Sequence, residues 1–337
     1  MKTITRRKLL ELAGASAAVA TLPAAAFAQA PTFANGAIIR TLLKDYTPAE
    51  LGGGATLFHE HLSLAPDFMD KFRAASAAVQ AANGVRPATP PPAAAGTTPP
   101  RPPLAGPTRD LAAMVADVNK AKAAGVACIV DAGHPDMGRD VEFARNVSLQ
   151  SGMPIIACAG FYSQPYYPAS IATMSEDDIV QAILEQIAAN PTGALGEIGS
   201  WDEMTVDERK VFRAVGRVHA ATNLPIITHT GIPGKAAIEQ LNILEDEGVN
   251  PASVVIGHLG NLVDTNVYVH KQICRRGAFV GFDRQGGNGD AQQIPLVMAL
   301  LEAGFADNLL FSADASSGYD KTMTAFARRL RDAAGMS

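Results

Sequence analysis

Short apolar runs alternate with longer amphipathic segments along most of this chain. Each apolar run is four to seven residues long and ends in a polar residue or a glycine, as expected for strands buried on both faces. The runs lie at 55–58, 126–131, 154–160, 194–198, 224–230, 253–258, 278–283 and 309–314. The segments between them are rich in Ala, Leu, Glu, Lys and Arg and have helical spacing. They predict helices at 108–124, 139–151, 175–189, 205–221, 234–247, 263–276, 290–303 and 319–333.

The alternation of eight strands with eight helices indicates the fold class. Strict strand–helix alternation predicts a parallel sheet, because consecutive parallel strands need a crossover connection. Eight such units in about 285 residues fit an α/β fold of the (β/α)8 TIM barrel type. A doubly wound sheet is the alternative that the same rhythm allows. The helix predicted at 319–333 is short and lacks a closing tail, so we expect the C-terminal end to be truncated.

One stretch interrupts the rhythm after the first strand. Residues 73–107 are rich in Ala, Pro, Gly and Thr, and nine of the 22 prolines lie in 87–107. This composition cannot fill a packed core and is typical of flexible or polyproline-like segments. We therefore predict a flexible loop insertion over 73–107 within one barrel domain of residues 31–337. A domain boundary is the competing interpretation.

The first thirty residues have the pattern of a twin-arginine export signal. Arg6 and Arg7 precede an Ala-rich apolar stretch at 12–22, and small residues at 26–30 offer cleavage sites. An ordinary secretory signal or an anchor is the alternative, although the apolar stretch is too short to span a bilayer. We expect residues 1–30 to be removed by the twin-arginine route and the mature protein to be periplasmic or secreted.

Composition and charge narrow the classes of partner. The formal net charge of −5 provides no basic footprint for nucleic acid. The rest of the chain holds no segment apolar enough for a membrane span. The three cysteines are an odd number, so we expect buried thiols rather than a disulfide framework. A small-molecule substrate is the partner that remains.

Polar side chains of one chemical type gather at the predicted strand ends. In a barrel, the carboxyl ends of all strands meet at one mouth, where active sites are built. Neutral imidazole and carboxylate are the ligands of divalent zinc, manganese, iron and cobalt. Six ligands are too many for one catalytic ion with an open position, and they suit two ions bridged by a carboxylate. The six candidates are His59, His61, Glu197, His229, His258 and Asp314.

These residues and their neighbours resemble the phosphotriesterase family of the amidohydrolase superfamily. The resemblance includes the motifs His-Glu-His-Leu at 59–62, Gly-Arg-Asp at 138–140, Ala-Gly-Phe-Tyr at 159–162, Thr-His-Thr at 228–230, Gly-His-Leu-Gly at 257–260 and Phe-Asp-Arg at 282–284. It implies that His59, His61 and Asp314 bind the more buried of two ions. His229 and His258 then bind the more exposed ion. Glu197 bridges them, at a position where the best-known members have a carbamylated lysine.

The resemblance also implies a reaction. Two divalent ions, Zn²⁺ with Mn²⁺, Co²⁺ or Fe²⁺ as alternatives, share a hydroxide that attacks a lactone, a carboxylic ester or an amide. Asp314 accepts the proton, and Tyr162 and Arg284 orient the nucleophile or the leaving group. Phosphotriester hydrolysis proper, a one-metal lyase and a non-catalytic exported binding protein are the alternatives. The family further implies a homodimer.

Other residues near the strand ends have plainer interpretations. Glu60 lies between the two histidines of the first strand and is expected to point away from the metal site, in a structural role. Trp201, the single tryptophan, follows the fourth strand and is predicted to wall the pocket. His134 is expected to be a loop residue, and His219 and His270 to be surface or structural residues of helices.

Overall fold

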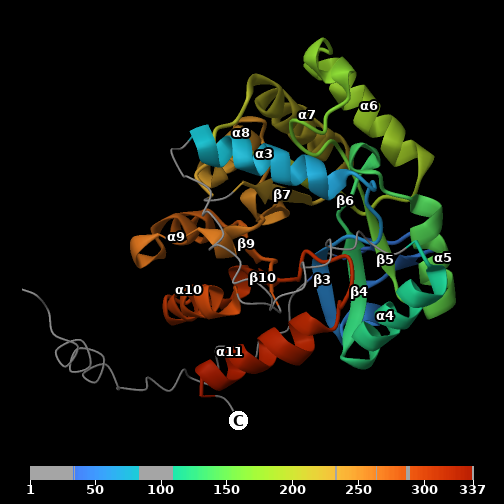
Figure 1. Ribbon diagram of the computed structural model, residues 1–337, viewed down its shortest axis with the longest axis vertical. Coiled ribbons are helices and arrows are strands. Elements are labelled where there is room, and N and C mark those ends of the chain that lie inside the picture. Colours follow the sequence, from blue (N-terminus) through green and yellow to red (C-terminus); the bar gives the residue numbers. More distant parts are fainter. Residues whose placement is uncertain are drawn as a thin grey trace, which may run out of the picture. The chain divides into compact units, whose positions relative to one another are not determined.

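Eight parallel strands form a nearly closed barrel sheet, with helices between successive strands (Figure 1). The computed structural model describes residues 33, 35–82, 109–231, 234–262, 264–285 and 289–335. The chain divides into a unit of Met1–Phe33 and a unit of Ala34–Ser337, and the barrel belongs to the second. The predicted export signal at 1–30 and residues 83–107 of the predicted insertion lie outside the described residues.

The barrel strands follow one another around the sheet in chain order. Each pairs in parallel with the next, from β3 to β10. This order confirms the predicted TIM barrel, because a doubly wound sheet reverses its strand order at a switch point. The strands are β3 (Ala55–Glu60), β4 (Val126–Asp131), β5 (Ile155–Ala159), β6 (Ala194–Ser200), β7 (Ile226–Thr230), β8 (Val254–Ile256), β9 (Phe279–Phe282) and β10 (Leu309–Phe311).

The seam between β3 and β10 is closed by hydrogen bonds near the carboxyl ends of both strands. The His59 amide donates to the Ser312 hydroxyl at 3.1 Å, across 253 positions of sequence. The Asp314 amide donates to the His59 carbonyl at 3.1 Å, and the His61 amide donates to the Ala315 carbonyl at 2.9 Å. The seam therefore holds His59 of β3 and His61, which follows β3, beside a third predicted ligand that follows β10.

Local sequence explains where several helices begin and end. Ser175 and Thr205 cap two helices by accepting from the amides of the residues three positions on, and both form capping boxes. Gly152 ends another helix with a left-handed φ of 64°. The helices after the barrel strands are α4 (Leu111–Ala123), α5 (Val141–Ser151), α6 (Glu176–Ala189), α7 (Val206–Thr222), α8 (Ala237–Asp246), α9 (Tyr268–Arg275), α10 (Asp290–Glu302) and α11 (Ala327–Ala333).

Smaller elements precede the barrel. They are a hairpin of β1 (Ile39–Arg40) and β2 (Asp45–Tyr46) and a single-turn helix, α2 (Pro48–Leu51). The Leu42 amide in the hairpin donates to the Ile155 carbonyl of β5 at 2.8 Å, which attaches the hairpin to the barrel. Among the described helices, none has both the length and the apolar character of a membrane span.

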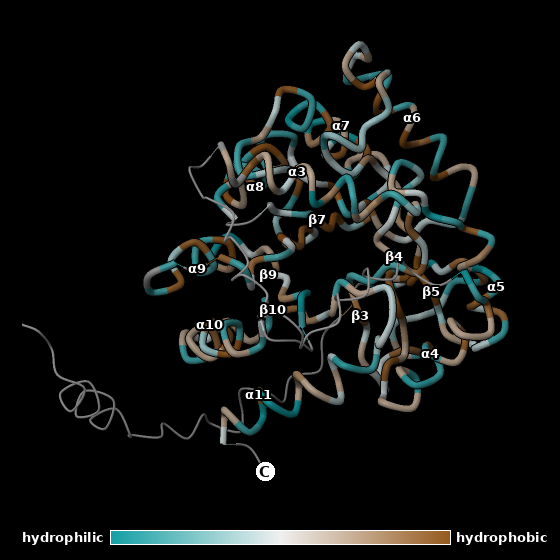
Figure 2. The backbone as a smooth tube through the Cα atoms, in the orientation of Figure 1, coloured by the Kyte–Doolittle hydropathy of each residue, from teal (hydrophilic) through white to brown (hydrophobic). Residues whose placement is uncertain are grey.

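Apolar side chains pack on both sides of the sheet, and the strands are largely brown in the hydropathy view of Figure 2. One cluster takes one buried residue from each of six consecutive strands, so it fills the barrel interior. Larger clusters lie between the strands and the helices. The three cysteines are buried and free, as expected from their number. The interior cluster consists of Phe58, Val130, Cys158, Ala194, Ile227 and Val255.

One helix departs from the prediction. Residues Phe68–Ala82 form α3, so the flexible insertion predicted from residue 73 is wrong for residues 73–82. Alanine is the strongest helix former, and Phe68 and Phe72 repeat at helical spacing, which together favour a helix over an irregular loop. The Phe72 ring lies 5.6 Å from the Trp201 ring, which places α3 beside the carboxyl end of β6 (cyan in Figure 1).

Candidate metal centre

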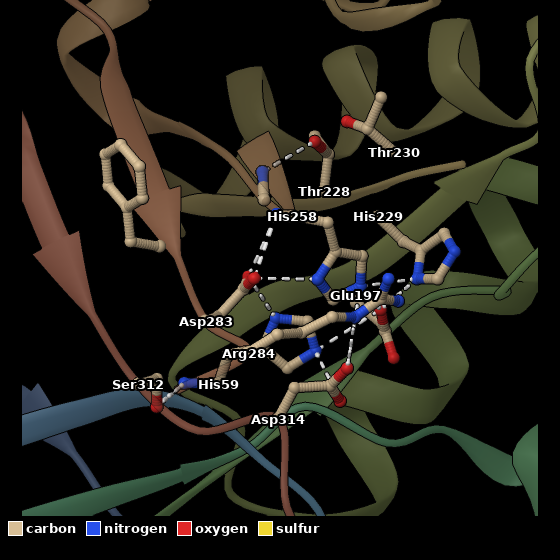
Figure 3. Close-up of polar contacts among 12 residues, drawn as sticks. His59, Glu197, Thr228, His229, Thr230, His258, Asp283, Arg284, Ser312 and Asp314 are labelled. Carbon is tan, nitrogen blue, oxygen red and sulfur yellow. Dashed lines mark hydrogen bonds and ion pairs between the residues drawn. The ribbon is translucent and has the colours of Figure 1, made fainter. Parts of the chain in front are cut away.

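The six predicted ligands meet at the carboxyl end of the barrel, and Figure 3 labels all of them except His61. The strands run in one direction, so residues that end or follow them share one rim. His258 follows β8 and Asp314 follows β10, and both have left-handed backbones, with φ of 62° and 49°. This conformation is uncommon for residues with a side chain, and the surrounding hydrogen bonds hold it at functional sites.

Four of the six residues form one group of candidate ligand atoms. The Nε2 atom of His61 lies 3.1 Å from one Glu197 oxygen and 3.1 Å from an Asp314 oxygen. The Nε2 atom of His59 lies 3.3 Å from the other Glu197 oxygen and 3.8 Å from Asp314. Two imidazoles and two carboxylates thus surround one position, with all of their candidate atoms within 4.8 Å of one another.

A second group shares Glu197 with the first. The Nδ1 atom of His229 lies 2.7 Å from Oε2 of Glu197, and the Nε2 atom of His258 lies 3.3 Å from the same oxygen. The Oε1 atom of Glu197 faces His61 in the first group. This carboxylate therefore stands between two sets of imidazoles, which is the placement that a bridging ligand requires.

The donor atoms of these groups fit divalent metal ions. His59 is fully buried, and its Nε2 atom has no hydrogen-bond partner among the described residues. Leaving such an atom unsatisfied costs about 1–3 kcal/mol. The Nε2 atom of His258 lies 2.7 Å from the Nδ1 atom of His229, and at that distance the two rings can share only one proton. Imidazole with carboxylate is the donor set of zinc, manganese, iron and cobalt.

The electrostatics of the cluster also favour cations. Burial opposes ionisation of Glu197, but His59 and His229 outweigh it and hold the pKa of Glu197 well below its usual range. Burial likewise opposes ionisation of Asp314, yet His61 and the other imidazoles lower the pKa of Asp314 to about 2. Burial and a neighbouring imidazole lower the pKa of His229 to about 4. At neutral pH these residues are therefore two carboxylates and a neutral imidazole, which are the forms that bind metal.

Asp283, just past β9, holds two of the candidate ligands from behind. One of its oxygens lies 3.0 Å from Nδ1 of His59, and the other lies 2.7 Å from Nδ1 of His258. The His258 amide also donates to Asp283 at 3.0 Å. Burial alone would raise the pKa of Asp283, but His258 and His59 outweigh it and hold that pKa well below its usual range. A carboxylate in this position fixes the ring orientation and leaves each Nε2 for the metal.

The sequence contained a signal for Asp283, although no role was assigned to it. It belongs to the Phe-Asp-Arg motif and ends the apolar run predicted at 278–283. The rule that selected the other strand-end residues would have selected it as well. Its function depends on which atoms it contacts, and residue type and position alone do not determine those contacts.

Glu60 is buried and anchors the segment that carries Asp314. Its carboxylate accepts from the Ser312 hydroxyl at 2.7 Å, the Ala313 amide at 2.8 Å and the Ala315 amide at 2.9 Å. Burial raises the pKa of Glu60 to about 7, although these hydrogen bonds oppose the shift. Glu60 thus has the structural role expected of it, and it places Asp314 between two fixed amides.

Tyr162 and Arg284 lie beside the cluster, as the family resemblance implied. The Tyr162 hydroxyl lies 3.1 Å from Nδ1 of His229, and Nε of Arg284 donates to Asp314 at 3.1 Å. Burial raises the pKa of Tyr162 well above its ordinary value, so its hydroxyl remains a donor. His134, His219 and His270 lie outside the groups of candidate ligands.

A cavity of about 290 Å³ opens above the cluster. Candidate ligands and Arg284 form one wall, and residues from α3 and the segment before it form an apolar wall opposite. A smaller cavity of about 40 Å³ adjoins α3 and is lined by Trp201, which therefore walls the site as predicted. The larger cavity is lined by His61, Leu64, Phe68, Met69, Phe72, Tyr162, Glu197, His229, Arg284, Asp314 and Ser316.

Known proteins resemble this chain in both sequence and fold. Residues 39–331 match the phosphotriesterase family. The phosphotriesterase homology protein of Escherichia coli is 30% identical over 235 residues, which cover 64% of this chain and 80% of that protein. An aryldialkylphosphatase of Saccharolobus solfataricus is 32% identical over 209 residues, which cover 59% of this chain and 66% of that protein.

A solved structure extends the likeness to three dimensions. The crystal structure of the Escherichia coli phosphotriesterase homology protein, complexed with phosphate in its active site, has a TM-score of 0.68 and 26% sequence identity. The superposition covers 87% of this chain and 94% of that one. The family match over residues 39–331 includes every strand of the barrel and all six candidate ligands. The chain therefore belongs to the phosphotriesterase family of hydrolases.

Proposed function

We propose that this protein is a hydrolase with two metal ions that cleaves a lactone, a carboxylic ester or an amide. The observation that carries the proposal is the position of Glu197, which lies within 3.3 Å of imidazoles from both groups: Oε1 faces His61, and Oε2 faces His59, His229 and His258. A single catalytic ion held by the first group would leave His229 and His258 without a function. In this proposal Zn²⁺ occupies both positions, with Mn²⁺, Co²⁺ or Fe²⁺ as the other candidates.

The residues divide between the two positions. His59, His61 and Asp314 would hold one ion, and His229 and His258 would hold the other. Glu197 would contact both. When bound, such a pair of ions makes water a nucleophile near neutral pH and polarises the oxygen of the scissile carbonyl or phosphoryl group.

Asp314 is the carboxylate that can take the proton of the attacking water. Its side chain is 18% exposed and lines the cavity, whereas the side chains of Glu197 and Asp283 are at most 2% exposed. Its low pKa means that it passes an accepted proton on rather than keeping it. Arg284 holds Asp314 in place through its Nε hydrogen bond.

Tyr162 would orient the substrate. Its hydroxyl lies at the cavity wall and stays protonated, so it can donate to the carbonyl oxygen or to the leaving group. Water adds to the carbonyl carbon, the carbon–oxygen or carbon–nitrogen bond breaks, and the leaving alcohol or amine takes up a proton. No side chain needs to form a covalent bond with the substrate.

A metal analysis and a substrate screen test the proposal together. We expect about two divalent ions per chain and chelator-sensitive hydrolysis in a panel of lactones, aryl esters, N-acyl amino acids and phosphotriesters. Metal-free protein that binds small molecules tightly without turnover would instead support an exported binding protein.

Two alternatives are separated by the substrate panel and by one variant. The likeness to the aryldialkylphosphatase favours phosphotriester hydrolysis as the second candidate, and it predicts that triesters are the best substrates of the panel. A one-metal lyase predicts that the Glu197→Ala variant keeps its activity.

Export and assembly complete the proposal. The paired Arg6 and Arg7 support export by the twin-arginine route and a periplasmic or secreted location. Replacing both with Lys should retain the precursor in the cytoplasm, which cell fractionation would detect. The family resemblance supports a homodimer, and light scattering on the purified protein would measure its mass.

A further inference from the structure

Phe72 of α3 lies where the two cavities of the site adjoin. The larger cavity and the smaller cavity have only three lining residues in common among the described ones, Phe72, His229 and Arg284. His229 and Arg284 belong to the candidate catalytic centre. Phe72 is the residue of the three that comes from α3, so its ring is the part of the α3 wall that separates the two spaces.

One face of α3 forms the apolar wall of both cavities. Phe68, Met69 and Phe72 line the larger cavity, and Ser76 and Val79 continue the same helical face along the smaller one. Residues three or four positions apart share one side of a helix, so this face runs along the helix from the metal cluster outwards. A substrate group that passes Phe72 would therefore enter the smaller cavity.

The first turn of α3 is held firmly in place. The Tyr166 hydroxyl donates to the Phe68 carbonyl at 2.9 Å, and the two rings lie 4.8 Å apart. The Phe72 ring contacts the rings of Trp201 and His229, at centroid distances of 5.6 Å and 6.3 Å. The position of Phe72 relative to the candidate ligands is thus fixed from both sides.

One wall of the larger cavity favours an apolar substrate group. Arg284, whose Nε is bonded to Asp314, and the candidate ligands form the polar wall. The wall opposite them consists of aliphatic and aromatic side chains. Such a wall favours an alkyl, acyl or aryl group.

We propose that Phe72 determines substrate specificity by ending the compartment that holds the apolar group of an ester, lactone or amide. The compartment lies along the first turns of α3, and the Phe72 ring sets the greatest chain length that it accepts. This inference deepens the proposed function and rests on it for the identity of the scissile bond. The length limit itself concerns binding and can be measured without turnover.

The binding test uses 2-alkanones of increasing chain length, which are neutral carbonyl compounds that the enzyme cannot hydrolyse. Trp201 is the single tryptophan and lies against the Phe72 ring, so its fluorescence reports occupancy. We expect affinity to rise about fourfold per added methylene in the wild type until a limiting length. In Phe72→Ala, the limit should move to longer chains, because the two cavities join. An unchanged limit would overturn the proposal.

Two further variants control for indirect effects. Ser76 lines the smaller cavity, so Phe72→Ala combined with Ser76→Phe should refill the added space and restore the wild-type limit. Arg73 is 54% exposed and pairs with Asp70 on the outer side of α3, so Arg73→Ala should leave the limit unchanged. Thermal melting of each variant verifies folding. A limit that moves equally in Arg73→Ala would refute a specific role of Phe72.

A turnover series separates this inference from the proposed function. Metal-loaded wild type and Phe72→Ala are assayed with aryl esters from acetate to decanoate. A matched displacement of the length limit for esters and ketones supports both ideas. Displacement for ketones with no hydrolysis by either protein supports the role of Phe72 and refutes the proposed reaction.

Discussion

Two walls of the larger cavity, a floor of candidate ligands and a roof formed by α3, are built in different ways. The floor consists of the candidate ligands at the strand ends. Asp283 orients His59 and His258 through buried hydrogen bonds of 3.0 Å and 2.7 Å. Glu60 fixes the segment around Asp314 with three more. Hydrogen bonds to two buried carboxylates thus set the directions of His59 and His258 and the position of the segment around Asp314.

The roof is α3, and its contacts are mainly between rings. The Phe68 ring lies near the rings of Tyr162 and Tyr166, and Phe72 lies against Trp201. The Tyr166 hydroxyl supplies a side-chain hydrogen bond to the roof, at the Phe68 carbonyl. Apolar contact is non-directional, so the roof tolerates changes of shape that the floor does not.

This difference separates two tasks. A metal site requires ligands held within about 0.5 Å of their binding geometry, which only a satisfied polar network provides. Selection of an apolar group requires volume and surface, which rings provide. We expect changes in the floor to alter metal binding and turnover. Changes in the roof should alter which substrates bind.

The largest effect is expected for Glu197→Ala, because this residue contacts both candidate positions. We expect loss of at least one ion per chain and a fall in turnover on the order of 10³-fold or more. Elemental analysis and initial rates measure both. Glu203 is exposed and close in sequence, so Glu203→Ala is the matched control. Full activity in Glu197→Ala would remove the basis for two metals.

Asp314→Asn should separate proton transfer from metal binding. The amide keeps an oxygen for the metal and cannot accept a proton, so much of the metal should remain while turnover falls about 10²-fold or more. The metal content and the rate are measured on the same sample. Unchanged turnover would refute the role of Asp314 as proton acceptor.

Asp283→Asn should weaken the floor from behind. An amide accepts hydrogen bonds from both His59 and His258 less well than a carboxylate does. We therefore expect metal affinity to fall about 10–100-fold. Competition with a fluorescent chelator measures the affinity. Because the roof is untouched, the length limit for 2-alkanones should stay at its wild-type value. A changed limit would show that floor and roof are coupled.

The smallest effect on the site is expected for a change at Glu208 of α7. This buried residue caps the helix with Thr205, and burial raises its pKa from 4.5 to about 7 against the hydrogen bonds of nearby amides, including that of Trp201. The folded protein then binds more protons than the unfolded chain between these pH values. Its stability should therefore fall as pH rises through this window.

The Glu208→Gln variant isolates that contribution. The free energy of unfolding of wild type relative to the variant should fall by about 3 kcal/mol between about pH 4.5 and pH 7. Urea unfolding at a series of pH values measures the difference. Metal content should be equal in the two proteins. A difference that is independent of pH would contradict the raised pKa.

Residue pattern alone predicted the barrel and the six candidate ligands because both depend on local rules. Buried parallel strands produce short apolar runs, and their carboxyl ends share one rim, so His59 and Asp314 could be grouped from opposite ends of the chain. The same rule also selects Asp283. The role of an aspartate at a strand end, however, depends on contacts that the sequence does not show.

The error at residues 73–82 arose from composition. Alanine and proline are both typical of linkers, but alanine is also the strongest helix former. Within residues 73–107 the prolines begin only at Pro87. The helical spacing of Phe68 and Phe72 was present in the sequence. The contacts of that face were not, because Tyr166 lies 98 residues beyond Phe68 and Trp201 lies further still along the chain.

The sequence by itself determined the barrel and the set of imidazoles and carboxylates at its strand ends. These follow from residue type and strand period, which are local properties. The tertiary structure decided which atoms face one another. It joined Asp283 to two histidines, Glu60 to the segment of Asp314, and Phe72 to the rim of the cavity, because such contacts depend on how distant segments pack.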